Sequence, residues 1–82
     1  MNEALLNRII LLMLRQAGSY LMPEDTLRIQ AELAMGGRAL DSEWDIIIRG
    51  LESERYITGV RPKLGGPVRW KITDAGLAAL HS

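Results

Sequence analysis

Near Glu54, the apolar residues of this 82-residue chain change their spacing from a helical repeat to alternation. Upstream of that point, apolar side chains recur three and four residues apart, as they do along one face of an amphipathic helix. Downstream, residues 56–60 read as a strand, residues 62–67 as a glycine- and proline-containing turn, and residues 68–72 as an alternating return strand. Because a period of two belongs to extended strands, the sequence predicts helices followed by a β-hairpin.

Two helical patterns occupy the first 35 residues. The first predicts a helix over residues 2–17 that ends at Gly18, followed by a short extended segment over residues 19–22. The second predicts a helix that has Pro23 at its first position and ends near Met35, because two glycines follow. Its expected core stripe consists of Leu27, Ala31 and Ala34.

A third helix is expected to begin at Asp41 or Ser42 and to run to about residue 53. Ser42 and Asp45 resemble a capping box, with aspartate in place of the usual glutamate. Thr73 or Asp74 should begin a last short helix that ends at residue 80. The third helix has a regular apolar face, which we expect to be buried together with Trp70; it consists of Trp44, Ile47, Ile48 and Leu51.

The residue composition excludes several classes of protein. There is no cysteine, which argues against a disulfide scaffold, a zinc finger or thiol chemistry. Ten lysines and arginines balance ten acidic residues, which excludes a polybasic binder. The longest apolar run, residues 9–14, is far shorter than the ~20 residues of a membrane span. We therefore expect one cytoplasmic domain over residues 1–82, without contact to a membrane.

The sequence contains no arrangement of residues that is typical of catalysis. The single histidine, His81, has no nucleophile at a plausible spacing, and neither glycine pair matches a phosphate-binding loop. We expect no enzyme activity, no cofactor, no metal and no small-molecule substrate.

Two short motifs flank the expected hairpin. Residues 51–58 read LESERYIT, and residues 71–77 read KITDAGL. Together with the order of the elements, these motifs resemble the winged-helix branch of the helix-turn-helix superfamily, and the likeness covers nearly the whole chain. The resemblance to small bacterial and phage-type members implies an α+β fold. It would consist of a three-helix core with a short strand, a C-terminal β-hairpin wing and a short terminal helix.

The resemblance also implies a function. In DNA-binding members of the family, the third helix lies in the major groove and the wing contacts the phosphate backbone. This chain would then bind double-stranded DNA and regulate transcription. Carried over to this sequence, the third-helix contacts would be Ser42, Ile46, Arg49 and Ser53, and the wing contacts would be Arg61, Lys63, Arg69 and Lys71.

The charges of the hairpin and of the third helix favour different binding partners. Residues 56–73 carry four positive and no acidic residues, which suits phosphate contact, whereas residues 41–55 carry five acids against two arginines. The basic residues could alternatively form only a solvated hairpin edge. Arg49 could alternatively have no role beyond an ion pair with Asp45 or Glu52 on its own helix. The alternative function is a winged helix used as a protein-interaction module in a larger assembly, without DNA binding, since an acidic third helix favours a basic protein partner.

The first helix suggests a surface for self-association. Leu11 falls within a stripe of polar residues on that helix, and Leu14 lies close to it, so the helix has a second apolar edge beyond its core face. The second helix gives a similar hint with Ile29 and Leu33. We therefore expect a homodimer or a protein-docking surface, formed by Asn7, Leu11 and Leu14.

Overall fold

The computed structural model describes residues 2–82, and this part of the chain has an α+β structure. It contains four helices and one three-stranded antiparallel sheet. None of these helices combines the length and the hydropathy that a membrane crossing requires. In chain order the elements are α1 (Glu3–Ala17), β1 (Met22–Pro23), α2 (Glu24–Met35), α3 (Asp41–Ser53), β2 (Ile57–Val60), β3 (Arg69–Ile72) and α4 (Asp74–Leu80).

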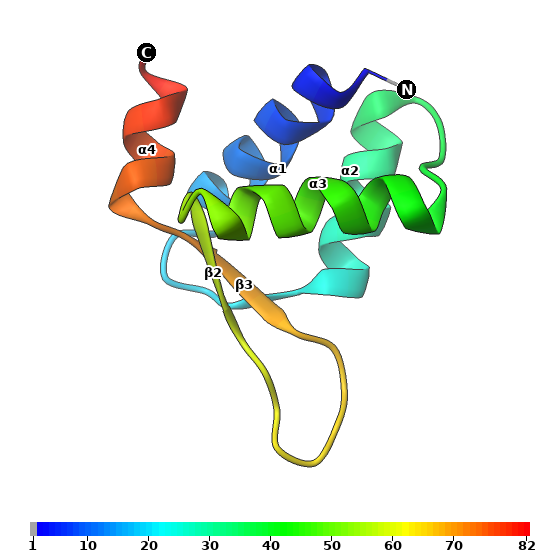
Figure 1. Ribbon diagram of the computed structural model, residues 1–82, viewed down its shortest axis with the longest axis vertical. Coiled ribbons are helices and arrows are strands. Elements are labelled where there is room, and N and C mark those ends of the chain that lie inside the picture. The colour runs from blue at the N-terminus through cyan, green and yellow to red at the C-terminus, as the bar shows by residue number, and fades with distance from the viewer. Residues whose placement is uncertain (1) are drawn as a thin grey trace.

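The sheet has the order β1-β3-β2, so the last strand of the chain lies in the middle. Trp70 on β3 is opposite Met22 on one side and Gly59 on the other. Figure 1 shows α3 crossing in front of α1 and α2, while the β2–β3 hairpin extends away from the helices. The expected alternation of β3 is confirmed, because its even-numbered residues are buried and its odd-numbered residues are exposed.

Most of the expected helix ends are confirmed. Gly18 follows α1 with a φ of 62°, as expected, whereas Asn2, expected as the first helical residue, caps the helix by accepting a hydrogen bond from the Leu5 amide at 3.0 Å. Thr73 caps α4, since its hydroxyl accepts from the Gly76 amide at 3.1 Å. These ends follow local rules that a sequence displays directly, because each depends on residues within one helical turn.

Two details of the helix starts differ from the expectation. Pro23 belongs to β1 and occupies the cap position of α2, so the first helical residue is Glu24. Ser42 does not cap α3; the helix begins at Asp41, and the Glu43 carboxylate accepts a hydrogen bond from the Leu40 amide at 2.9 Å. The capping interaction therefore occurs two residues before the position that the Ser42 pattern indicated.

The ends of α2 and α3 share one geometry although their residues differ. Gly36 has a φ of 77° and Arg55 has a φ of 62°, so both adopt the left-handed conformation. In each case the next residue donates to the carbonyl five positions earlier, at 3.2 Å after α2 and at 3.0 Å after α3. This is the Schellman arrangement, in which glycine is the preferred residue. Arg55 adopts it without a glycine's conformational freedom.

One cluster of buried apolar side chains joins the helices to the sheet. The expected faces of α3 and β3 are confirmed, and both tryptophans are buried. Leu27 and Ala31 of α2 belong to the cluster, but Ala34 is exposed, so the expected stripe of α2 is wrong at that position. The buried apolar residues are Leu6, Ile10, Leu11, Leu14, Met22, Leu27, Ala31, Ala39, Trp44, Ile47, Ile48, Leu51, Ile57, Trp70, Ile72 and Leu80.

The expected exposure of the α1 leucines is wrong. Leu11 is 5% exposed and Leu14 is fully buried. The reason is that α1 contacts α2, α3, α4 and β3, so it is covered on more than one side. Asn7 is half-buried beside them. A dimer surface centred on these leucines would have almost no exposed apolar area to offer.

Candidate nucleic-acid interface

The exposed side of α3 carries the four residues that the resemblance assigns to DNA contact. Ser42, Ile46, Arg49 and Ser53 are all exposed, on the side opposite the buried face of the helix. The Arg49 Nε donates to Asp45 Oδ2 at 2.9 Å, one helical turn earlier. Of the two partners that the sequence allowed for this arginine, the structure therefore shows Asp45.

Arg61 connects the hairpin to α3. Its two terminal guanidinium nitrogens donate to the two carboxylate oxygens of Glu52, each at 3.1 Å. Its Cζ also lies 5.8 Å from the centre of the Trp70 ring, within cation–π range. The hydrogen bonds to Glu52, and then the charge of that carboxylate, raise the pKa of Arg61. Arg61 therefore remains a cation wherever the protein is folded, and its charge is already engaged.

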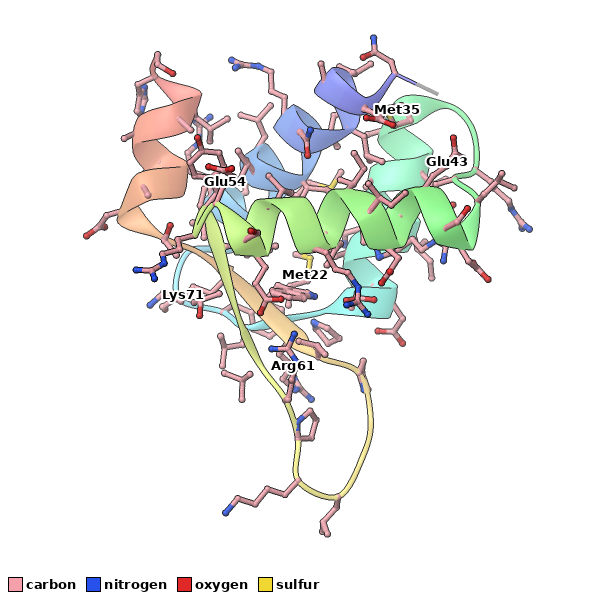
Figure 2. All side chains as sticks on the ribbon, viewed as in Figure 1. Met22, Met35, Glu43, Glu54, Arg61 and Lys71 are labelled. Carbon is pink, nitrogen blue, oxygen red and sulfur yellow. The ribbon has the colours of Figure 1, made fainter. Side chains whose placement is uncertain are left out.

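Glu24, the first residue of α2, contacts the same part of the hairpin. The Trp70 Nε1 donates to Glu24 Oε1 at 2.9 Å, and the Glu24 amide donates to the Val68 carbonyl at 2.8 Å. We call Glu24, Glu52, Arg61 and Trp70 the hairpin root. Figure 2 shows Arg61 below α3, where the hairpin leaves the helical part of the molecule. These contacts fix the direction in which the hairpin projects.

Beside the hairpin root lies a hollow of about 400 Å³ between α3 and the hairpin. Three carboxylates and two guanidinium groups line it, namely those of Glu24, Asp45, Glu52, Arg49 and Arg61. Both guanidinium groups are paired with carboxylates of α3. A phosphate that approached this hollow would meet an excess of negative charge.

Arg69 and Lys71 lie on a different face of the molecule. They alternate with the buried Trp70 and Ile72, so their side chains leave the sheet on the face opposite the core. Arg61 lies on the same side of the hairpin as Trp70, facing α3. Figure 2 shows Lys71 nearer to α4, away from Arg61. The structure therefore does not bring the predicted DNA-contact residues of the hairpin together on a single face.

Lys63 lies between these two groups, in the loop of the hairpin. Residues 61–67 are all exposed. Arg49 and Arg61 each pair with a carboxylate. Within residues 2–82, no carboxylate oxygen lies within 4.0 Å of a side-chain nitrogen of Lys63, Arg69 or Lys71. We call Lys63, Arg69 and Lys71 the hairpin cations. They carry the free positive charge of this part of the molecule.

Reasoning from the sequence missed the hairpin root. From the sequence, Glu52 is expected only as a partner for Arg49 on its own helix, and no contact between Glu24 and the hairpin is expected. The Glu52–Arg61 contact spans nine residues and the Glu24–Trp70 contact spans 46, so no local spacing indicates either. Within residues 2–82, no three His, Cys, Asp or Glu side chains form a group that could hold a metal ion.

Comparison with known proteins returns no relative. No family model, no curated protein and no solved structure matches this chain. The proposed function rests on the geometry of this chain and on the family resemblance of its motifs.

Proposed function

We propose that this chain is a winged-helix protein that binds double-stranded DNA and that its hairpin, the wing, makes the leading contacts. The observation that carries the proposal is the charge of the hairpin: residues 56–73 hold four cations and no acid. Three of the four, the hairpin cations, are not paired with a carboxylate within residues 2–82. Regulation of transcription is the role that the resemblance gives to such a protein.

Free cations on a projecting hairpin suit a phosphate backbone. Each lysine or arginine that neutralises a phosphate releases condensed counterions, which supplies affinity independent of sequence. The hairpin extends away from the helices (Figure 1), so its loop reaches a duplex before the acidic residues of α3 do. Lys63 is exposed in that loop, and Arg69 and Lys71 are exposed on the sheet beside it.

The third helix has a secondary part in this proposal. Its Asp45–Arg49 pair is exposed and spans one helical turn, and such pairs contribute only ~0.3–0.5 kcal/mol. A base edge or a phosphate could therefore take the place of Asp45 as the partner of Arg49. Ile46, one turn before Gly50 on the same face, could contact a thymine methyl group.

The acidity of α3 favours a second candidate function. Within Asp41–Ser53, only Arg49 is basic, against four acids. A hollow of about 400 Å³ between α1 and α3 is lined by two acidic residues, Glu3 and Glu54, and by the exposed Ile46. A basic protein partner would complement these charges, whereas a phosphate backbone would not. The chain would then be a protein-interaction module that does not bind DNA.

Titration of a labelled, mixed-sequence duplex by fluorescence anisotropy at ~50 and ~200 mM salt separates the two candidates. We expect micromolar binding that weakens steeply with salt. The K63A/K71A double variant should make the slope of log K against log salt less steep by about 1.8. Each phosphate that loses its lysine accounts for ~0.9 of this change. The R8A/R15A variant is the matched control, because it removes two exposed cations of α1 and should leave the slope unchanged.

Absence of binding at ~50 mM salt and ~1 mM protein would overturn the DNA proposal in favour of a basic protein partner. An equal decrease of the salt slope in the hairpin variant and the α1 variant would also count against the DNA proposal. Binding would then depend on overall charge rather than on the hairpin.

A further inference from the structure

The outer side of α2 carries an apolar surface that the core does not use. Ile29, Leu33 and Leu40 are 58%, 77% and 68% exposed. They line one hollow of about 850 Å³ between α2 and the loop that leads to α3. We call these three residues the α2 patch. Single exposed leucines are common, but here three large apolar side chains surround one hollow and form a contiguous apolar surface.

The α2 patch offers both a ridge and a recess. Leu33 stands out from the helix, and the hollow beside it is lined by Gly36 and Gly37, which have no side chains. A Cβ atom added to either glycine would meet no heavy atom within 4 Å, so the space above them is open. A surface that has both features can pack against a copy of itself, with the leucine of each copy beside the glycines of the other.

The recess is held in shape before anything binds. Arg28 donates to the Ala39 carbonyl at 2.7 Å and to Asp41 Oδ1 at 2.8 Å. The Ala39 amide donates to Glu32 Oε2 at 2.8 Å. The hydrogen bond to Asp41, and then the charges of Asp41 and Glu32, raise the pKa of Arg28 against the effect of burial. A loop that is already ordered loses little conformational entropy on association.

The charges at the two ends of the α2 patch identify its partner. Asp25 lies in the first turn of α2, six residues before the midpoint of Ile29 and Leu33, and Arg38 follows the two glycines after α2 and lines the hollow. Both are exposed, and within residues 2–82 neither forms an ion pair. If two copies of α2 pack antiparallel about a two-fold axis through that midpoint, Asp25 of each copy lies near Arg38 of the other.

We propose that the α2 patch binds a second copy of this chain, in an antiparallel, two-fold symmetric contact between α2 helices. The antiparallel order also sets the acidic start of each helix beside the basic residue that follows the end of the other. Three apolar side chains from each copy cover less than the ~800 Å² that each partner gives to a stable interface. The contact is therefore at the weak, transient end of specific interfaces.

This contact replaces the dimer surface that the sequence placed on α1. It does not depend on the proposed DNA binding, because the α2 patch and the hairpin share no residue. If both proposals hold, a dimer carries two hairpins and twice the number of phosphate contacts, so DNA would promote dimer formation.

Sedimentation equilibrium between ~10 µM and ~1 mM protein tests the dimer, because a weak association becomes visible over this range of concentration. The wild-type mass should rise from 9.1 kDa toward twice that value. The L33D variant should raise the dissociation constant at least tenfold, because it sets a charge in the apolar contact. The I46D variant is the control, because Ile46 is equally apolar and 64% exposed but lies on α3.

A charge exchange tests the orientation. D25R and R38D should each weaken association, and the D25R/R38D double variant should restore it, since each arginine again faces an aspartate of the second copy. Thermal melts confirm that every variant is folded. A wild-type protein that is monomeric at ~1 mM overturns the proposal, as does an L33D effect no larger than that of I46D. Failure of the double variant to regain association overturns the antiparallel contact.

Discussion

The root and the loop of the β2–β3 hairpin are built in different ways. At the root, Trp70 is buried and donates to Glu24, while Arg61 is bound to Glu52, so side chains of α2 and α3 hold the two strands. In the loop, residues 62–67 are all exposed, and no side chain there forms an ion pair with the rest of residues 2–82. The root should therefore carry stability and the loop should carry binding.

A glycine of α4, packed against the residue before β2, gives the largest expected effect. A Cβ atom on Gly76 would overlap the backbone carbonyl of Tyr56, the residue that precedes β2, and backbone atoms cannot turn aside as a flexible side chain can. We expect Gly76→Ala to lower the free energy of unfolding by about 3 kcal/mol, at the upper end of the usual cost of overpacking. Urea denaturation followed by tryptophan fluorescence measures the loss.

The control for this substitution is another helical glycine. Gly50 lies on the exposed side of α3, and a Cβ atom there meets nothing within 4 Å. Gly50→Ala should therefore raise the free energy of unfolding by ~0.5–1 kcal/mol, because alanine is the better helix former. If both substitutions changed the free energy of unfolding in the same direction, the close approach of α4 to Tyr56 would not limit stability.

A smaller effect is expected where α2 meets the hairpin. Glu24→Ala leaves the buried Trp70 N–H without its acceptor, which costs about 1–2 kcal/mol in the free energy of unfolding. Asp25→Ala is the control, since it removes the neighbouring acid from the same helical turn but no contact to the indole. Its loss should stay near ~0.5 kcal/mol, the contribution of an acid at a helix start. Equal losses of unfolding free energy in the two variants would show that the effect comes from an acid at the start of α2, and not from the hydrogen bond to Trp70.

The same contrast explains what the sequence could predict. The ends of α1 and α4 and the alternation of β3 depend on neighbours in the chain, and these predictions are confirmed. The exposure of Leu11 was wrong, because a helical periodicity does not show how many elements cover the helix. The Arg61–Glu52 pair was missed for a related reason, since it forms only once the hairpin folds back beside α3. The assignment of the interface to DNA stays a prediction.

The smallest effect on stability is expected in the loop, and it is the most informative for function. Lys63 is exposed, and its side chain has no ion pair within residues 2–82. Lys63→Ala should change the free energy of unfolding by less than ~0.5 kcal/mol, as surface substitutions usually do. The same variant should reduce the salt slope of DNA binding by ~0.9. Urea denaturation and anisotropy on the same sample measure both quantities.

Leu64→Ser is the matched control in this loop, because Leu64 is fully exposed and uncharged. It should change neither stability nor the salt slope, since it removes no charge and no packing interaction. A loss of stability in Lys63→Ala would show that the loop also supports the fold, and the distinction between root and loop would then fail. A change in the salt slope without a change in stability, and without the same change in the R8A/R15A variant, assigns a phosphate contact to the loop, because the folded state is otherwise intact.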